Sequence, residues 1–302
     1  MKERGVPMNV PTNCALCPRQ CGINRSLYTG ACGASSTVRV ARAALHLWEE
    51  PCISGTRGSG TVFFSGCPLR CCYCQNYKIS AEAFGKDIDS AQLAQIFCQL
   101  EAAGAHNINL VTASAYLPWV IQALDIAKPK IPIVYNTSGY ETREAITALA
   151  PYVSIWLCDL KYHSPALSAK YSAAQDYFAV ASSAILQMAA LCPAPQYDKD
   201  GIMQKGLVVR HLALPGCVQD GIACLSWLAE SLNANSFVLS LMSQYTPFYK
   251  AHEHKEINRR IASYEYKQLL AAAERLGLSN GFMQKRTSAK EEYTPDFDLE
   301  GV

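Results

Sequence analysis

The sequence predicts an α/β fold in which six β-α units form a partial, TIM-like (β/α)6 barrel behind a cysteine-rich N-terminal extension. From residue 60 onward, short apolar runs alternate with amphipathic helical stretches, which is typical of β-α units on a parallel sheet. The 302 residues, half of them hydrophobic, can bury a full core. Six units give a barrel less closed than the eight-unit TIM fold.

The elements follow one another along the chain after an irregular lead-in with a short strand at 38–41. Six main strands are expected at 61–65, 107–112, 132–136, 154–159, 206–212 and 236–241. The helices between them are expected near 90–103, 116–127, 141–149, 176–190 and 219–232. Ser90 suits the N-cap of the first of these helices, and Gly104 suits its end. A helix near 263–276 and a short strand at 281–284 close the domain.

Three regions are predicted on this basis. They are a cysteine-rich extension over residues 1–54, a core barrel over 55–285 and a charged tail over 286–302 that is ordered only in part. In such a barrel, ligands bind at the C-terminal ends of the strands. Each strand should therefore deliver polar or small residues at its end, and most of the six do.

Charge and hydropathy exclude several classes of protein. A net charge of +2 with no long basic run gives no electrostatic footprint for nucleic acid. No stretch approaches the roughly 20 apolar residues of a membrane span, and no apolar run follows the first residues as in a signal peptide. The 14 cysteines are grouped locally, which favours reduced, metal-binding thiols in a low-oxygen cytoplasm over disulfides.

Three cysteines directly after the first main strand form the most informative motif. Cys67, Cys71 and Cys74 are spaced C-x3-C-x2-C, and Pro68 favours the tight loop that lets their thiolates surround one soft metal centre. A closed zinc site or a common electron-transfer cluster takes four protein ligands. Three thiolates leave one iron of a four-iron cluster open, and S-adenosylmethionine (SAM) can chelate it through its amine and carboxylate. Cys72 lies outside the spacing and is interpreted as a packing thiol.

This motif, with the aromatic Tyr73 before its last thiol, resembles the radical SAM signature. Residues 59–80 resemble a branch of that superfamily close to the pyruvate formate-lyase-activating enzymes. The resemblance implies a partial barrel of the radical SAM type, with a 4Fe-4S cluster on the three cysteines and Tyr73 near SAM. It also implies reductive cleavage of SAM to a 5'-deoxyadenosyl radical, which abstracts hydrogen from a substrate.

The ends of the second and third strands carry candidate SAM contacts. Thr112 and Ser114 stand where the activating enzymes carry a Gly-Gly-Glu-like turn for the SAM amino group, and this chain lacks that carboxylate. Their hydroxyls can still accept from an ammonium, although Ser114 can equally cap the next helix. Asn136 and Thr137 resemble the Asn/Asp-Thr-x-Gly turn of those enzymes and offer oxygens to the methionine end of SAM, or serve a plain turn.

The later strands end in charged residues. Asp159 and Lys161 resemble an Asp-Leu-Lys triplet of the activating enzymes, which implies that Lys161 pairs with the SAM carboxylate. Arg210 is expected to face the ligand, because a barrel interior seldom accepts an unpaired guanidinium. His211 should then face a helix, since side chains alternate along a strand. No residue can be given a catalytic role from the sequence.

The N-terminal extension contains a second group of thiols. Cys14, Cys17, Cys21 and Cys32 are spaced C-x2-C-x3-C-x10-C in a segment without helix or strand periodicity. A metal can supply the fold that a small core cannot, and the spacing fits zinc or a further iron-sulfur cluster. Free thiols on an ordered loop remain the alternative.

The leading functional hypothesis is a radical SAM enzyme. By resemblance its substrate is a glycine in a partner protein, and an electron donor such as flavodoxin or ferredoxin reduces its cluster. The first alternative is a radical SAM oxidoreductase or modifying enzyme that acts on a peptide or small molecule. The second is a zinc-stabilised binding module with no catalysis.

Overall fold

The structure is a computed structural model that describes residues 10–283 and 295–302. The strands are β1 (Val38–His46), β2 (Ser59–Phe64), β3 (Lys86–Ile88), β4 (Ile108–Val111), β5 (Ile133–Thr137), β6 (Ile155–Asp159), β7 (Gln196–Tyr197), β8 (Met203–Leu212), β9 (Val238–Met242) and β10 (Gly281–Met283). The helices are α1 (Pro51–Ser54), α2 (Tyr77–Ser80), α3 (Ser90–Ala102), α4 (Leu117–Ala127), α5 (Arg143–Leu149), α6 (Pro165–Ser172), α7 (Tyr177–Leu191), α8 (Val218–Ser231) and α9 (Ser263–Arg275). Two short 3₁₀ helices are η1 (Ala113–Tyr116) and η2 (Ala251–Glu253).

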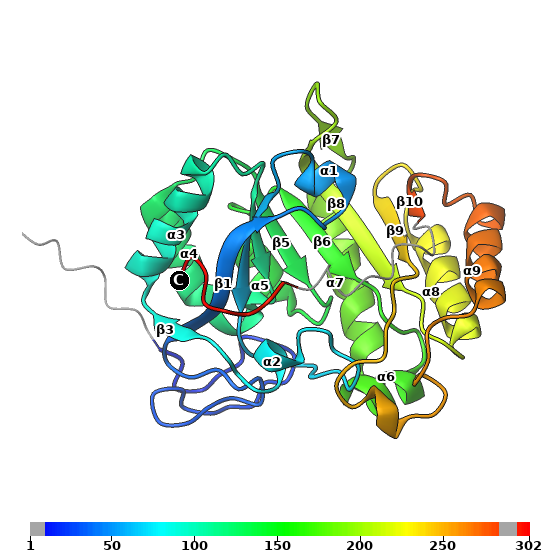
Figure 1. Cartoon of the computed structure of the whole chain (residues 1–302), viewed down its shortest axis with the longest axis horizontal. Helices are drawn as coiled ribbons and strands as arrows, with labels where there is room; N and C mark the ends of the chain where they lie inside the picture. The colour runs from blue at the N-terminus through cyan, green and yellow to red at the C-terminus, as the bar shows by residue number, and fades with distance from the viewer. Residues whose placement is uncertain (1–9, 284–294) are drawn as a thin grey trace, which may run out of the picture.

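In the described part of the chain, ten strands form one large mixed sheet (Figure 1). Nine of them follow the order β10-β9-β8-β6-β5-β4-β2-β1-β3, and β7 pairs with β8. The six predicted main strands are β2, β4, β5, β6, β8 and β9, and they pair in parallel in the order of the sequence. The path ends at β10 and β3, so the sheet is open. The α/β class is confirmed, whereas the curvature of a partial barrel stays a prediction.

The lead-in before β2 differs from the prediction. Instead of a short strand at 38–41, β1 has nine residues and pairs antiparallel with β2, from Val40 opposite Phe64 to His46 opposite Ser59. β1 also pairs antiparallel with β3, and Arg39 of β1 forms an ion pair of 2.7 Å with Asp87 of β3 at the surface. Residues 42–46 carry no local signal for the longer strand, whose backbone groups are satisfied by pairing with β2. The boundaries predicted for extension, core and tail stay a prediction.

The end of the chain covers the outer side of β1. Leu299 N donates to Ala41 O at 3.1 Å, and Ala43 N donates to Glu300 O at 2.8 Å. The predicted strand at 281–284 is present as β10, except that its last residue lies outside the described residues. Most of the predicted disorder in the tail likewise concerns residues outside the described part, so it stays untested.

The two faces of the parallel strands carry different cores. On the face covered by the long helices, alternate residues such as Leu110, Trp156 and Leu239 join the main hydrophobic cluster. On the other face, Cys52 and Ile53 of α1 pack in a second cluster. The strand residues of that second cluster are Val134, Ile155, Leu157, Met203, Val208 and Val238. Helix α1 therefore covers the early part of these strands, and burial of Ile53 alone contributes roughly 1.5–3 kcal/mol.

Strand alternation then determines which polar residues share the α1 face. Two residues beyond Leu157 comes Asp159, and two residues beyond Val208 comes Arg210. The strand register places Asp159 beside Arg210, and Arg210 beside Ser240 of β9. A row of polar side chains thus follows the apolar α1 layer, toward the C-terminal ends of the strands. His211, by the same alternation, faces α8 as predicted, with its Nδ1 2.7 Å from Leu160 O.

The N-cap of the first long helix lies one residue before the predicted one. Asp89, rather than Ser90, is the N-cap of α3, and its carboxylate accepts from Gln92 N at 2.8 Å. The Gln92 side chain accepts from Asp89 N at 3.0 Å in return, which completes a capping box. Among the described residues, no helix is long and apolar enough to cross a membrane.

Candidate functional site

The three-cysteine loop starts at the C-terminal end of β2, where the backbone turns sharply. Gly66 has a φ of +92°, and a Cβ at this position would lie 2.7 Å from Cys32 O, so only glycine fits without a shift. The next amide, Cys67 N, donates to Cys32 O at 3.0 Å. The loop is therefore held against the N-terminal extension, and Arg19 adds a second contact by donating to Pro68 O at 2.9 Å.

The loop thiols border a cavity of about 230 Å³ and are free of disulfides. The cavity is lined by Cys71, Tyr73, Cys74, Gln75, Asn76, Asp159, Lys161, Arg210, Leu212, Met242, Gln244, Tyr245 and Thr246. Two hydroxyls approach the sulfurs, since Ser172 Oγ lies 2.9 Å from Cys71 Sγ and Ser80 Oγ lies 3.3 Å from Cys74 Sγ. Desolvation by burial raises the pKa of Cys67 to about 11, so this thiol holds its proton at neutral pH until a metal displaces it.

The donor set fits an iron-sulfur cluster better than one metal ion. Among the described residues, no three His, Cys, Asp or Glu side chains are grouped for a single ion. A cluster instead takes its thiolates on separate irons. Hydroxyl donors at Cys71 and Cys74 suit thiolates that carry cluster charge. Cys67, Cys71 and Cys74 are the residues that would hold a 4Fe-4S cluster, and this assignment stays a prediction.

A chain of buried hydroxyls supports the Cys71 side of the loop. Tyr73 Oη lies 2.6 Å from Tyr162 Oη, which in turn lies 2.8 Å from Ser172 Oγ. Ser172 then donates to Cys71 Sγ. Burial raises the pKa of Tyr73 well above its usual value, so the phenol stays neutral. This chain fixes the hydroxyl that approaches the Cys71 sulfur.

Charged residues from β6 and β8 form an ion-pair network beside the thiols. Lys161 Nζ lies 2.6 Å from Asp159 Oδ2, and Arg210 Nε lies 2.8 Å from Asp159 Oδ1. Burial alone would raise the pKa of Asp159, but Arg210 and Lys161 outweigh it and lower that pKa. Burial would lower the pKa of Lys161, but Asp159 and then Cys71 raise it to about 12. Lys161 is therefore a permanent cation near the Cys71 sulfur.

The network continues to a residue that the sequence analysis missed. Arg210 Nη1 lies 3.2 Å from Glu49 Oε2, and Arg210 Nη2 donates to Asn136 Oδ1 at 2.5 Å. Glu49 Oε1 accepts from Asn109 at 3.1 Å and from Asn136 at 3.2 Å. Glu49 stands between β1 and α1, in the stretch predicted to be irregular. Its only signal was a pair of carboxylates beside Trp48.

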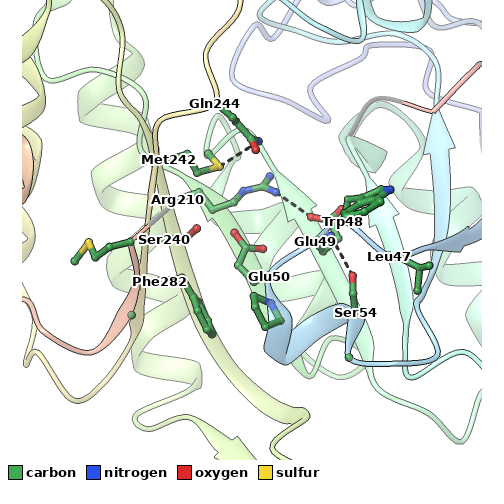
Figure 2. A pocket seen from close by; sticks show the side chains of 14 residues that line it. Leu47, Trp48, Glu49, Glu50, Ser54, Arg210, Ser240, Met242, Gln244 and Phe282 are labelled. Carbon is green, nitrogen blue, oxygen red and sulfur yellow. Dashed lines mark hydrogen bonds and ion pairs between the residues drawn. The ribbon is translucent and has the colours of Figure 1, made fainter. Parts of the chain in front are cut away.

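A second cavity, of about 570 Å³, adjoins the first and contains the neighbouring Glu50 (Figure 2). It is lined by Leu47, Trp48, Glu49, Glu50, Pro51, Ser54, Gly55, Arg210, Ser240, Met242, Gln244, Gly281, Phe282 and Met283. Arg210, Met242 and Gln244 line both cavities. The thiol loop and the α1 region thus border neighbouring spaces on one face of the sheet.

Three predicted contacts lie elsewhere. Thr137 Oγ1 donates to Glu141 Oε1 at 2.5 Å, and Ser114 Oγ donates to the same oxygen. Burial raises the pKa of Glu141, which is a carboxylate near the turn where the sequence seemed to lack one. Thr112, with a φ of +58°, stands before η1, and none of these three hydroxyl residues lines either cavity. Tyr73, Asp159, Lys161 and Arg210 do line the smaller one, and Asn136 contacts Arg210.

The N-terminal thiols are mostly buried but are not grouped for one ion in the described structure. Cys14, Cys17 and Cys32 are buried, and burial raises the pKa of Cys17 to about 12. Cys21 is partly exposed. The second metal site predicted for these four cysteines stays a prediction. What the extension does in the structure is pack against the three-cysteine loop.

The segment after β9 also contacts this loop. Lys250 N donates to Cys72 O at 2.8 Å, and Tyr249 stacks on Tyr77 with ring centroids 5.1 Å apart. Farther along, Arg259 makes two contacts of 2.7 Å with Glu265. The segment after β9 is therefore held by contacts at both of its ends.

Residues 54–117 match the family profile described as a 4Fe-4S single cluster domain. The matched stretch contains β2, the three-cysteine loop and β4. The chain is thus similar to this family over that stretch, and Cys67, Cys71 and Cys74, identified from their spacing, lie inside it.

Relatives of the whole chain are more distant. The chain is 28% identical over 284 residues to the Uncharacterized protein MJ0674 of Methanocaldococcus jannaschii, which covers 90% of this chain and 78% of that protein. Two solved structures of Streptococcus suis SuiB are similar in part. SuiB bound to the precursor peptide SuiA has a TM-score of 0.46 and 12% identity over 69% of this chain and 43% of SuiB. SuiB bound to S-adenosylmethionine has a TM-score of 0.46 and 12% identity over 78% and 48%. The similarity spans less than half of SuiB, and scores this low do not establish a common fold.

Proposed function

We propose that this protein is a radical SAM enzyme that cleaves SAM reductively at a 4Fe-4S cluster held by Cys67, Cys71 and Cys74. The observation that supports it most is the shared cavity, in which two of these thiols face Asp159, Lys161 and Arg210. Three sulfur ligands with no fourth leave one iron open to SAM. When bound, the cluster supplies one electron for carbon-sulfur cleavage, and the resulting 5'-deoxyadenosyl radical takes hydrogen from the substrate.

The residues of the cavity bind and orient SAM in this proposal. Lys161 keeps its positive charge at neutral pH and pairs with the SAM carboxylate. Asp159 and Arg210 hold Lys161 and one another in place through their ion pairs. Tyr73 walls the cavity beside the thiols and excludes water. Asn136 fixes the Arg210 guanidinium.

The substrate and the partners belong to the same proposal. A glycine in a partner protein is the substrate that the resemblance to activating enzymes supports, with flavodoxin or ferredoxin as electron donor. The alternative is an oxidoreductase or modifying enzyme acting on a peptide or small molecule, and the cavity of about 570 Å³ beside the first favours a small ligand. Free, uncrosslinked cysteines support a cytoplasmic location.

The test begins with protein that is purified and reconstituted without oxygen. We expect brown protein with broad absorbance near about 400 nm and about four irons at the loop, as an iron-sulfur cluster requires. With SAM and dithionite it should form deoxyadenosine. Cys71→Ala should abolish this product, whereas Cys98→Ala, which changes an exposed cysteine on α3, should not. Colourless protein that contains only zinc would show instead that the chain is a zinc-stabilised binding module.

A further inference from the structure

The larger cavity holds a carboxylate that the SAM site leaves unused. Glu50 is 8% exposed, and its Oε2 has no hydrogen-bond partner. Figure 2 shows its side chain in the cavity, pointing toward Ser240 and Arg210. The hydrogen bond from the Ser240 hydroxyl serves only part of the carboxylate. A buried acceptor of this kind requires a donor from elsewhere.

The charges around Glu50 do not balance. Glu49, Glu50 and Asp159 supply three carboxylates to this group, while Arg210 and Lys161 supply two cations. Asp159 pairs with both cations, and Glu49 pairs with Arg210. Among the described ion pairs, none includes Glu50. With Glu50 ionised, the group therefore lacks one positive charge, and the larger cavity beside Glu50 is the space in which a cation would supply it.

Apolar side chains line another part of the cavity. Trp48, Met242 and Phe282 line it together with Leu47, and Trp48 is 53% exposed at its rim. An indole at that place can stack on an alkyl chain or attract a cation. The cavity thus combines the Glu50 carboxylate with an apolar patch.

We propose that the larger cavity binds a small molecule that carries a protonated amine on an apolar arm, with Glu50 as the counterion of the amine. A carboxylate or phosphate ligand would meet Glu49 and Glu50 and be repelled. A bare metal ion would lack ligands, because no three suitable side chains are grouped in the described residues. A neutral apolar ligand would leave Glu50 Oε2 without a partner. That this amine is the substrate rests on the proposed function, but its binding does not.

Titration calorimetry on the full, cluster-loaded chain without SAM tests the binding. Phenylbutylamine is the probe, and phenylbutanol and phenylbutanoate are its neutral and anionic counterparts. We expect only the amine to bind. Glu50→Gln should weaken binding by about 10- to 100-fold, the range for a hydrogen bond to a charged group. Glu230→Gln removes an exposed carboxylate on α8 and should change nothing. Equal binding of alcohol and amine, or an unchanged affinity in Glu50→Gln, would overturn the proposal.

Two further measurements keep the outcomes distinct. Circular dichroism on Glu50→Gln establishes that the variant is folded, and Glu50→Asp, which keeps the charge, should restore part of the affinity. A titration in saturating SAM should leave the amine affinity in place. If SAM displaces the amine, the larger cavity belongs to SAM and this proposal is wrong. If the amine binds but no deoxyadenosine forms under any condition, the proposed function fails while the amine site stands.

Discussion

Isosteric removal of two neighbouring carboxylates should change stability in opposite directions. Asp159→Asn removes the one carboxylate that pairs with both Lys161 and Arg210, at 2.6 and 2.8 Å. Glu50→Gln removes a buried carboxylate that makes no ion pair in the described structure and has one unpartnered oxygen. Asp159→Asn leaves two buried cations without their shared carboxylate, whereas Glu50→Gln removes a buried negative charge that has no ion-pair partner.

The magnitudes follow from burial. Loss of one partner from a buried ion pair costs about 3–5 kcal/mol. The side chains of Asp159 and Lys161 are 15% and 19% exposed, and Arg210 keeps Glu49 as a partner, so the lower end of that range applies to Asp159→Asn. An unsatisfied buried polar group costs about 1–3 kcal/mol. Because the amide of glutamine also needs partners, we expect Glu50→Gln to raise the free energy of unfolding by about 1 kcal/mol.

The pH dependence of stability independently tests whether Glu50→Gln stabilises the protein. Burial raises the pKa of Glu50 above its value in the unfolded chain. Below the unfolded value of about 4.3 the carboxyl is protonated in both states, so Glu50→Gln should be neutral there. Between that value and the folded pKa the carboxyl ionises in the unfolded chain but not in the folded one, so the wild-type protein loses stability and the advantage of the variant grows. The advantage should be complete once the pH exceeds the folded pKa.

Urea unfolding of the reduced, metal-free chain from pH 4 to pH 8 measures both effects. Midpoints should move in opposite directions at pH 7 with unchanged slopes, since neither change alters the surface exposed on unfolding. If Glu50→Gln loses as much stability as Asp159→Asn at pH 7, the charge of Glu50 is compensated within the protein. The count of charges on which the proposed amine site rests would then be wrong.

Three other predictions concern the loop and its supports. Ser172→Ala removes the hydroxyl donor to Cys71 Sγ and should lower the reduction potential of the cluster by roughly 40 mV, the equivalent of a hydrogen bond of about 1 kcal/mol. A redox titration followed by electron paramagnetic resonance measures this shift. An unchanged potential would contradict the role of this hydroxyl. Glu265, whose pKa its ion pair lowers to about 2, should contribute about 3 kcal/mol at pH 7, so the stability gap to Glu265→Gln should close as the pH falls from about 4.3 toward 2. Gly139→Ala places a Cβ 2.5 Å from a backbone oxygen, whereas Gly104 has a similar φ but open space around it. In urea unfolding, Gly139→Ala should therefore cost about 2 kcal/mol more stability than Gly104→Ala. Equal losses would rule out the clash.

The sequence predicted what short-range spacing determines. The three cysteines were identified from the intervals between them, and the apolar runs located the six main parallel strands. Arg210 was assigned to the ligand side because a buried guanidinium needs partners, and the structure supplies Asp159 and Glu49 as those partners. The position of His211 against α8 followed from alternation alone.

Features that depend on distant pairing could not be predicted. Glu49 and Glu50 enter the site because β1 pairs with β2 and directs the chain across the sheet to α1, and nothing in the local sequence signals that path. Ser114 and Thr137 follow strands in the expected places, but Glu141 attracts their hydroxyls. The residue type and the end of its strand therefore predict the region in which a side chain lies. The direction of that side chain depends on which hydrogen-bond partner lies near it in the folded structure.

Helix α1 also closes one side of the larger cavity to any bound molecule. Because Cys52 and Ile53 fill the space against the early part of the strands, a ligand anchored at Glu50 cannot extend in that direction. The apolar part of a longer ligand has to extend toward the other lining residues, such as Trp48 and Phe282. The packing of α1 against the strands thus limits the length of the ligand that the cavity can accept.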